Sequence, residues 1–296
     1  MNVNYEYYRT FYYVAKYGNF TKAANALCAN QPNVTRSINK LEEQLGCRLF
    51  LRTNRGVTLT QEGEHLFKHV EVAQEHLQQG EHELAGNTGL QTGNLVISAS
   101  ETALNLFLLE KLSLFHERYP GIHLRIFNNS TPQALSTLEY GIADLAVVTT
   151  PLAGGKSLKT FPLMSFREIL TCGRTFSHLA QQTLSLKDIE DYPLVMLSPD
   201  TMTYTLYNQF FLENDVILHP DTEVATSDQL LPMIRANLGI GFLPVQIAAD
   251  ALNRGDIYQI FLREMIPLRC VTLVHDPRKP LSIAAKEFEK LLLNPS

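Results

Sequence analysis

The sequence predicts an α/β protein in three parts: a small N-terminal all-α domain with a short hairpin, one long helix, and a large region of alternating strands and helices. Apolar residues recur at helical spacing through the first sixty residues. They recur again over residues 61–85, at alternating intervals of four and three. From Asn94 onward, short apolar runs alternate with helical segments and polar loops, which indicates a parallel sheet covered by helices on both faces.

The helix that follows Asn30 combines an apolar stripe with a polar, basic face. Asn30 has the short polar side chain preferred at a helix N-cap, and Pro32 falls in the first turn, where a missing N–H costs nothing. Val34, Ile38 and Leu41 recur at helical spacing, so this stripe faces a core. The opposite face carries side chains that hydrogen-bond base edges and phosphates: Gln31, Asn33, Thr35, Arg36, Asn39 and Lys40.

Elements on either side of this helix strengthen a DNA-binding interpretation. Thr21 is expected to cap a shorter helix, Lys22 to Leu27, and two short helices joined by a tight turn are how a helix-turn-helix fills a major groove. Residues 49–59 predict a hairpin with Arg52 and Arg55 at its tip, placed to reach the DNA backbone or the minor groove. The alternative is an ordinary amphipathic helix pair whose polar face is only solvated.

Charge is divided unevenly along the chain. Residues 1–60 hold eight Lys and Arg residues against three Glu, a balance of +5, whereas the remaining residues hold 17 basic against 27 acidic, a balance of −10. The formal net charge of −5 therefore conceals a basic N-terminal region. Because nucleic acid is polyanionic, this asymmetry places a nucleic-acid surface at the N-terminus and tells against the rest of the chain lying on phosphate.

One run of residues carries a family resemblance. In order and without a gap, it consists of Phe20, Thr21, Ala23, Ala24, Leu27, Asn30, Gln31, Pro32, Val34, Thr35, Ile38, Leu41, Glu42, Leu45, Gly46, Leu49, Phe50, Arg52, Arg55, Val57, Leu59, Thr60, Glu62 and Gly63. The run closely resembles the N-terminal winged helix-turn-helix of LysR-type transcriptional regulators. Where this chain has Asn33 the family usually has Ala, so this position adds an amide able to shift base preference.

The resemblance extends over essentially the whole chain and implies its domains. It implies a winged helix-turn-helix domain over residues 1–60, a linker and dimerisation helix over 61–88, and an effector-binding domain over 89–296. The last is expected to have two α/β lobes, shaped like a bacterial solute-binding protein, with lobe I at about 93–162 and 267–296 and lobe II at about 163–266. The residues expected to contact DNA are Thr21, Gln31, Pro32, Asn33, Thr35, Arg36, Asn39, Lys40, Arg52 and Arg55.

The helix over residues 61–85 has the spacing of a coiled-coil seam. A helix of about 25 residues spans roughly 37 Å, close to one turn of DNA, so a dimer built on it would hold two reading heads at half-site separation. The seam residues are Leu66, Val70, Ala73, Leu77 and Leu84, with Gly80 where a further seam residue belongs. His65 and His69 have a spacing that can bind zinc, but they flank the seam among acidic residues, so a solvated coiled-coil face is the preferred interpretation and no metal is expected.

The resemblance places a small-molecule inducer between the two lobes. Hydroxyls and backbone N–H groups at helix N-termini favour a carboxylate or another small anion, although the same residues also serve simply as helix caps. Glu101 opposes an anion there unless its side chain points outward. The candidate effector-binding residues at the strand ends are Ser100, Thr102, Asn128, Asn129, Ser130, Thr149, Ser198, Thr201 and Ser227.

Other classes of protein fit the sequence less well. No Gly-x-Ser-x-Gly elbow, phosphate-binding loop or zinc-binding His-Glu pair is present, so an enzyme is not expected. Cys28, Cys47, Cys172 and Cys270 lack paired spacing, which suits a reducing compartment, with inert thiols favoured over redox sensors. Neither a signal peptide nor a membrane-length apolar run is recognisable, so a cytoplasmic location is expected and an exported solute-binding protein is disfavoured.

The sequence therefore predicts a transcriptional regulator that binds double-stranded operator DNA and responds to a small effector, without a cofactor. We expect a homodimer formed through the linker helix or a homotetramer completed through the effector lobes. RNA polymerase is a further partner that the family allows, and activation and repression are both compatible with the pattern. The alternative is a DNA-architectural or constitutive repressor protein whose α/β domain serves only oligomerisation.

Overall fold

The computed structural model describes residues 3–53, 56–84, 92–152 and 157–294, and for residues 52, 53, 56, 75, 76, 79 and 82–84 it describes the backbone alone. The chain divides into two compact units, residues 1–88 and 89–296. Within the described ranges, no helix is both long enough and apolar enough to cross a bilayer.

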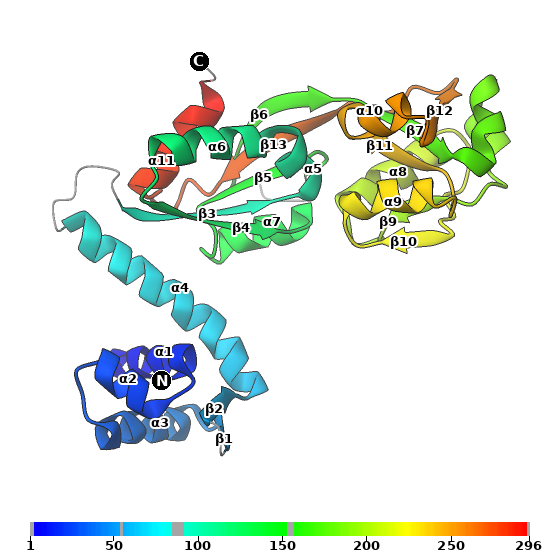
Figure 1. The fold of residues 1–296 in the computed structure, drawn as a ribbon. Coiled ribbons are helices and arrows are strands. Elements are labelled where there is room, and N and C mark those ends of the chain that lie inside the picture. The colour runs from blue at the N-terminus through cyan, green and yellow to red at the C-terminus, as the bar shows by residue number, and fades with distance from the viewer. Residues whose placement is uncertain (1–2, 54–55, 85–91, 153–156, 295–296) are drawn as a thin grey trace. The chain divides into compact units, whose positions relative to one another are not determined.

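The N-terminal unit contains three short helices, a hairpin and a long helix in its described part (Figure 1). Its elements are α1 (Tyr5–Tyr17), α2 (Phe20–Ala26), α3 (Gln31–Leu45), β1 (Phe50–Thr53), β2 (Gly56–Leu59) and α4 (Gln61–Leu84). The predicted apolar stripe of α3 forms the core: Ile38 and Leu41 are fully buried against Phe11, Val14 and Ala23 from the first two helices. The helix-turn-helix and the hairpin are thereby confirmed.

Side-chain caps fix where α2 and α3 begin. Asn30 caps α3 as predicted. The prediction that Thr21 caps the preceding helix is wrong, because Asn19 Oδ1 accepts hydrogen bonds from the backbone N–H groups of Thr21 and Lys22 at 2.8 and 3.0 Å. Asn19 is therefore the cap, and α2 begins at Phe20 rather than at Lys22.

A buried carboxylate joins the hairpin to α3. Glu42, which is 7% exposed, accepts hydrogen bonds through Oε1 from the backbone N–H groups of Leu49 and Phe50 at 2.7 and 3.2 Å. Its Oε2 accepts from Arg48 at 2.8 Å. The first turn of α4 closes on the same strand: a Cβ at Gly63 would lie 2.2 Å from the carbonyl oxygen of Leu49, so only glycine fits there. These contacts fix the hairpin beside α3.

The first seam residues of the long helix α4 pack within the N-terminal unit itself. Leu66 and Val70 pack against the helix-turn-helix core, and the hydroxyl of Tyr5 in α1 donates to Gln74 Oε1 at 2.9 Å. Leu77, farther along, is 47% exposed. The seam residues therefore present a partly open apolar face along α4.

The C-terminal unit has two lobes, each with its own sheet (Figure 1). In lobe I the strand order is β4-β3-β5-β13-β6. The strands are β3 (Gly93–Ala99), β4 (Ile122–Asn128), β5 (Leu145–Thr149), β6 (Lys159–Phe166) and β13 (Arg269–His275). β4, β3 and β5 run parallel as predicted, but β13 runs antiparallel to both β5 and β6, so the sheet is mixed.

Helices cover both faces of the lobe I sheet, as predicted. On one face, a helix formed by α5 (Glu101–Ala103), a π-helical turn (Leu104–Leu108) and α6 (Leu109–Arg118) packs with α11 (Ile283–Leu293). The rings of Phe115 and Phe288 meet there with centroids 5.0 Å apart. On the other face, α7 (Thr131–Glu139) buries Leu138 against Val148 of β5.

Lobe II is built around a second, smaller sheet in the order β11-β7-β12-β8, with the parallel pair β9–β10 beside it. The strands are β7 (Glu168–Gly173), β8 (Thr183–Leu184), β9 (Val195–Leu197), β10 (Thr222–Val224), β11 (Gly241–Pro244) and β12 (Ile257–Leu262). The helices are η2 (Arg174–Gln181), η3 (Leu186–Ile189), α8 (Met202–Leu212), η4 (Ser227–Gln229), α9 (Leu230–Arg235) and α10 (Val245–Asn253). Thr226 precedes η4 as its N-cap.

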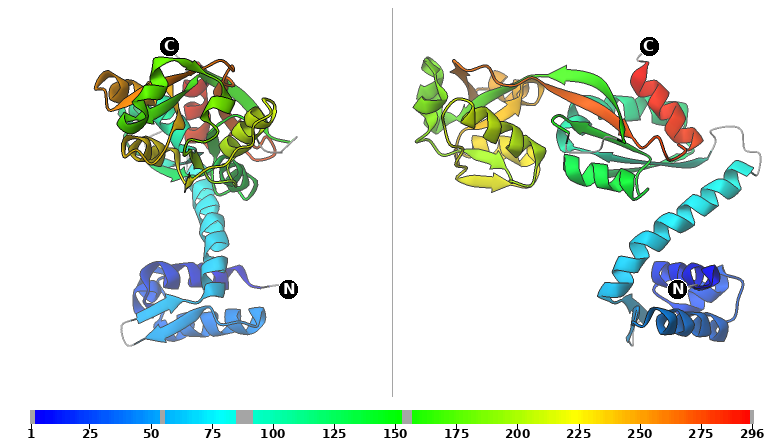
Figure 2. Two further views of the ribbon diagram at one scale, coloured as in Figure 1. Left: turned by 90° about the vertical axis from the view of Figure 1, so that its right-hand side faces the viewer. Right: turned by 180° about the vertical axis from the view of Figure 1, so that it is seen from behind.

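The chain crosses between the lobes twice (Figure 2). It first crosses at Arg167, the single residue between β6 and β7, and returns through residues 263–268, between β12 and β13. The sequence pattern had put these crossings near Leu163 and Pro267. β6 was not predicted from the sequence. It lies at the edge of the sheet, where Pro162 is tolerated.

Candidate functional site

The polar face of α3 is an exposed surface in the N-terminal unit. A shallow groove is lined there by Gln31, Pro32, Thr35, Arg36, Asn39, Lys40 and Glu43. The groove brings together six of the predicted DNA-contacting residues. Asn33 and Thr21 are exposed but lie outside its lining, and Glu43 was not predicted.

The cations of this face have no ion-pair partner among the described residues. Neither Arg36 nor Lys40 forms an ion pair with any described residue, whereas Arg9 pairs with Glu6 and Arg48 pairs with Glu42. Free guanidinium and ammonium groups beside amides and a threonine hydroxyl form a donor-rich surface that suits phosphates and base edges. This chemistry favours a polyanion over an acidic or apolar partner.

The hairpin lies next to this face, since Glu42 joins β1 to α3. In its register, Phe50 pairs with Leu59 and Arg52 with Val57. The side chain of Arg52 lies outside the described atoms, and Arg55 lies outside the described residues. The backbone pairing establishes the hairpin, but the role of its two arginines stays a prediction.

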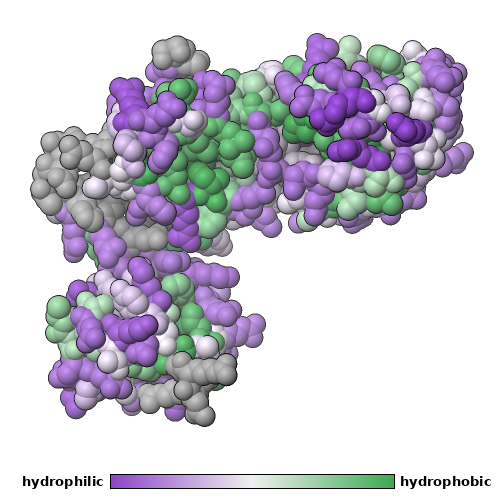
Figure 3. All heavy atoms as spheres, viewed as in Figure 1, coloured by the Kyte–Doolittle hydropathy of each residue, from purple (hydrophilic) through white to green (hydrophobic). Residues whose placement is uncertain are grey.

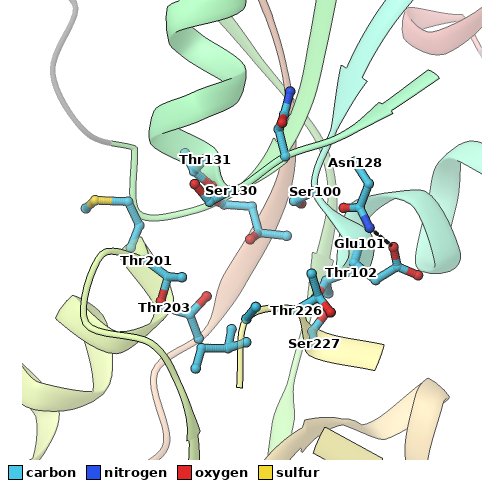
Figure 4. Close-up of a pocket in the computed structure, with 15 residues that line it drawn as sticks. Ser100, Glu101, Thr102, Asn128, Ser130, Thr131, Thr201, Thr203, Thr226 and Ser227 are labelled. Carbon is cyan, nitrogen blue, oxygen red and sulfur yellow. Dashed lines mark hydrogen bonds between the residues drawn. The ribbon is translucent and has the colours of Figure 1, made fainter. Parts of the chain in front are cut away.

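In the C-terminal unit, a polar cavity of about 50 Å³ lies between the two lobes (Figure 4). The effector residues predicted from the sequence lie in its lining, with one exception: Ser100, Thr102, Asn128, Asn129, Ser130, Thr149, Thr201 and Ser227. Further lining residues that were not predicted as effector contacts are Glu101, Thr131, Leu197, Met202, Thr203, Ala225 and Thr226. Residues far apart in the sequence thus converge on one small space.

Ser198 is the predicted residue that does not line the cavity. Its hydroxyl and its backbone N–H both donate to the carbonyl oxygen of Val224, at 3.1 and 3.0 Å. These bonds continue the pairing of β9 with β10 by one residue. The carbonyl oxygen of Ser198 in turn accepts a hydrogen bond from the Thr201 hydroxyl at 2.8 Å. Ser198 therefore supports the loop that carries Thr201.

Four helices of the described chain begin at the cavity: α5 and α7 from lobe I, and α8 and the short η4 from lobe II. Ser100 Oγ accepts from the Ala103 N–H at 3.4 Å, and Thr201 Oγ1 accepts from the Tyr204 N–H at 3.2 Å, so both residues also act as caps. The first-turn N–H groups of a helix have no intrahelical acceptor and carry partial positive charge. Helix starts facing one cavity from both sides favour an anion.

Glu101 does not place a bare negative charge in this cavity. Its two carboxylate oxygens accept from the side-chain amides of Asn105 and Asn128, at 2.7 and 2.6 Å. Figure 4 shows the carboxylate turned toward Asn128 and away from Ser130 and Thr201. Glu101 still belongs to the cavity lining, so its charge is shared with two amide donors and turned to one side of the space where an anion would bind.

A direct hydrogen bond joins the lobes at the cavity. Thr102 Oγ1, from the start of α5, lies 3.0 Å from Ser227 Oγ, from η4. Thr102 is buried, at 6% exposure. A ligand between the lobes would therefore sit beside an existing contact between them.

Beneath the cavity lies a buried ion pair that the sequence did not reveal. Arg269, the first residue of β13, is 3% exposed, and its Nη1 donates to Glu168 Oε1 at 3.0 Å. Tyr207 donates to Glu168 Oε2 at 2.6 Å, and burial and the neighbouring carboxylate raise the pKa of Tyr207. An isolated arginine opening an otherwise apolar strand was the available signal, because a buried arginine needs partners.

The described cysteine and histidine side chains form no comparable site. All four cysteines are free thiols, and burial raises the pKa of Cys172 to about 11, which makes its thiolate scarce at neutral pH. His65 and His69 pack their rings 5.3 Å apart on α4. Among the described residues, no group of three or more His, Cys, Asp or Glu side chains is arranged to hold a metal.

Comparison with protein families gives two matches. Residues 88–294 match the family described as "LysR substrate binding domain", and residues 5–64 match the family described as "Bacterial regulatory helix-turn-helix protein, lysR family". Together the two matches cover both units.

Individual relatives are similar over nearly their whole length. The chain is 26% identical to a probable RuBisCO transcriptional regulator of Gracilaria tenuistipitata var. liui, over 95% of this chain and 92% of that protein. It is 24% identical to the HTH-type transcriptional activator CmpR of Synechocystis sp., over 97% and 94%.

Solved structures show the same fold. Full-length CbnR complexed with its target DNA aligns with a TM-score of 0.70 at 18% identity, covering 98% of this chain and 99% of that one. The virulence activator AphB of Vibrio cholerae aligns with a TM-score of 0.60 at 18% identity, covering 98% of each chain.

Proposed function

Because the chain belongs to the LysR family of DNA-binding transcriptional regulators, we propose that it reads operator DNA through α3 and the hairpin and responds to a small anion bound between its lobes. Two observations support this proposal. The basic face of α3 is exposed and forms no ion pair within the described residues, and a hydroxyl-lined cavity lies at the starts of α5, α7, α8 and η4. The family consists of regulators rather than enzymes, so the cavity serves binding and not turnover. We propose no cofactor beyond the effector.

In the DNA complex, Gln31, Pro32, Asn33, Thr35, Arg36, Asn39 and Lys40 enter the major groove or contact its edges. All of these side chains except the half-buried Thr35 are exposed, and Arg36 and Lys40 form no ion pair within the described residues, which supports this role. Thr21 contacts the backbone beside them, and Arg52 and Arg55 extend from the hairpin to the backbone or the minor groove. Counterion release by these cations makes the affinity depend strongly on salt.

We propose that two chains pair through α4. Leu66, Val70 and Ala73, with Tyr5 and Tyr8 of α1, line an apolar groove of about 300 Å³ along this helix. A second α4 is a suitable occupant, because it offers the same seam with the same spacing. Pairing would place two α3 helices for a two-part operator, as half-site readers require.

A tetramer completed through the C-terminal units is the second step of assembly. Figure 3 shows apolar side chains gathered over lobe I, where α6 lies. Leu109 and Leu114 of α6 are 51% and 44% exposed, and such a patch marks a contact surface. We place the assembly in the cytoplasm, with RNA polymerase as a further partner when it activates.

The test combines DNA binding and ligand binding on the full-length chain. Salt-dependent retardation of operator DNA, with weaker retention of a scrambled duplex, is the result expected. A thermal-shift screen with small carboxylates and inorganic oxyanions separates a ligand-responsive regulator from an architectural protein, because a ligand that binds only the folded state raises Tm. Salt-independent binding or no duplex binding overturns the DNA role, and no Tm change with any anion overturns the anionic effector.

A further inference from the structure

The buried Arg269 touches the ligand cavity only through two threonines. Its Nη2 donates both hydrogens, one to Thr149 Oγ1 at 2.8 Å and one to Thr203 Oγ1 at 2.9 Å. Both threonines line the cavity, whereas Arg269 does not. Thr149 lies at the end of β5 in lobe I and Thr203 in the first turn of α8 in lobe II, so one guanidinium nitrogen holds a hydroxyl from each lobe.

The other two guanidinium nitrogens, Nε and Nη1, donate to acceptors outside the cavity lining. Nε donates to the carbonyl oxygen of Thr150 at 2.9 Å, and Nη1 donates to Glu168 at 3.0 Å. The Phe166 ring lies 5.3 Å from the guanidinium carbon. The ion pair is therefore held in one orientation, with its carboxylate end toward Tyr207 and its Nη2 edge toward the two hydroxyls.

This orientation sets the direction of the hydroxyl hydrogens. A hydroxyl has one hydrogen to donate, and when its oxygen accepts from a cation that hydrogen points away from the cation. Neither Thr149 nor Thr203 donates its hydroxyl hydrogen to an acceptor among the described residues. A hydrogen bond received from a charged donor also polarises the hydroxyl and makes it a stronger donor.

We propose that Arg269 is the positioning residue that makes the cavity selective for a small oxyanion, by turning the Thr149 and Thr203 hydroxyls into donors aimed at the ligand. This inference rests on the proposed function and names the group responsible for its ligand preference. A ligand oxygen that only accepts hydrogen bonds satisfies both hydroxyls. A ligand N–H in the same place would approach a buried cation and lose its bond to water.

The cavity volume limits the size of such a ligand. A cavity needs a volume of about 10–15 Å³ to hold one water molecule. The volume of about 50 Å³ therefore corresponds to roughly three to five water-sized groups. Formate, acetate, bicarbonate, sulfate and phosphate fall in this range. Acetamide is the matched neutral probe, because it has the shape of acetate and replaces one acceptor oxygen by an NH₂ donor.

The experiment is a double-mutant cycle on the full-length chain, with affinities measured by calorimetry for acetamide and for whichever of the five anions binds tightest. One arm removes the hydroxyls with Thr149→Val and Thr203→Val. The other arm removes the charges together with Arg269→Met and Glu168→Gln, because a lone buried carboxylate would destabilise the fold. Thr205→Val is the matched control, since Thr205 is exposed on the same helix and bonds back to the Thr201 carbonyl.

We expect each arm to weaken anion binding by about ten- to one-hundredfold, the loss typical of hydrogen bonds involving charge. Because Arg269 acts through the threonines, the variant that combines both arms should bind the anion with the same affinity as the hydroxyl arm alone, within about twofold. If the arginine and the threonines acted independently, the losses of affinity in the two arms would instead multiply. The ratio of anion affinity to acetamide affinity should fall toward one in the charge arm. Thr205→Val should bind as the parent does.

The outcomes separate the two proposals. If none of the five anions binds the parent, the anionic effector itself is overturned. If an anion binds and the hydroxyl arm loses affinity, but the charge arm keeps both its affinity and its ratio, Arg269 has no positioning role. Multiplying losses also overturn it, because they show that Arg269 acts independently of the threonines. Operator retardation confirms that each variant is folded in its N-terminal unit, and near-ultraviolet circular dichroism checks the C-terminal unit.

Discussion

Positive charge on α3 is exposed and, within the described residues, unpaired, whereas the arginine beneath the ligand cavity is 3% exposed and paired with Glu168. The exposed charges act over a distance set by salt, so they can attract and hold a polyanion before any base is read. The buried charge is shielded from salt and acts only through atoms it touches. The two units therefore use positively charged side chains in two different ways: one set is open to solvent, and the other is held by buried partners.

The largest expected effect tests the buried side of this comparison. Arg269→Met leaves Glu168 charged and buried without its cation, and breaking a buried pair in this way costs about 3–5 kcal/mol in the free energy of unfolding. Urea denaturation followed in the C-terminal unit measures it. Adding Glu168→Gln should recover most of the loss. A single variant as stable as the parent would show that the pair is not needed to hold the fold.

A second prediction asks whether the N-terminal unit also depends on a buried charge. Glu42→Ala leaves the N–H groups of Leu49 and Phe50 without their acceptor, and should lower the stability of that unit by about 2–3 kcal/mol. Operator affinity should fall as well, because the hairpin loses its attachment to α3. Glu43→Ala, on the adjacent exposed position, is the control for stability and should change it by less than about 0.5 kcal/mol.

The exposed side is tested by Arg36→Ala, which should cost about 1–3 kcal/mol of operator binding if Arg36 reads a base. If Arg36 contacts phosphate, affinity should fall equally on specific and scrambled duplexes, and the slope of log affinity against log salt should decrease by about one. Band-shift titrations at several salt concentrations distinguish the two. Unchanged affinity on both duplexes would remove Arg36 from the interface.

The smallest effect concerns a carboxylate in lobe I. Hydrogen bonds from Arg278 hold the pKa of the buried Asp276 at about 2, below its ordinary 3.8. A lowered pKa contributes stability that is fully present above the unfolded value and is lost as the pH falls toward the folded one. Asp276→Asn should therefore be less stable than the parent at pH 7, and the difference should shrink between about pH 4 and pH 2. A difference independent of pH in urea midpoints would rule this linkage out.

Local sequence patterns predicted the exposed face of α3 well, but they did not predict the buried ion pair beneath the cavity. The face of α3 follows from helical spacing and from the cap at Asn30, both of which lie within a few residues of one another. Eight of the nine predicted effector residues line the cavity because each lies at the end of a strand or in the segment after it, a position that the alternation of elements also reveals locally. Their role in binding stays a prediction.

Arg269 was not predicted because its partners are distant in the chain. It lies 120 residues from Thr149 and 101 from Glu168, and no spacing rule joins such positions. Ser198 shows the opposite case, since a favourable local position did not reveal that its hydroxyl bonds Val224 instead. Thr21 likewise lost its predicted capping role to Asn19, whose side chain offers the same chemistry two residues earlier.

Arg167 is the single residue between β6 and β7, and this shortness restricts how the lobes move. Two bodies tethered by one residue cannot slide apart along the tether, so a change between them is a turn about that point, with residues 263–268 following. The inter-lobe cavity is lined by residues of both lobes. A turn that changes the spacing of these residues would move the far ends of the lobes through a longer arc.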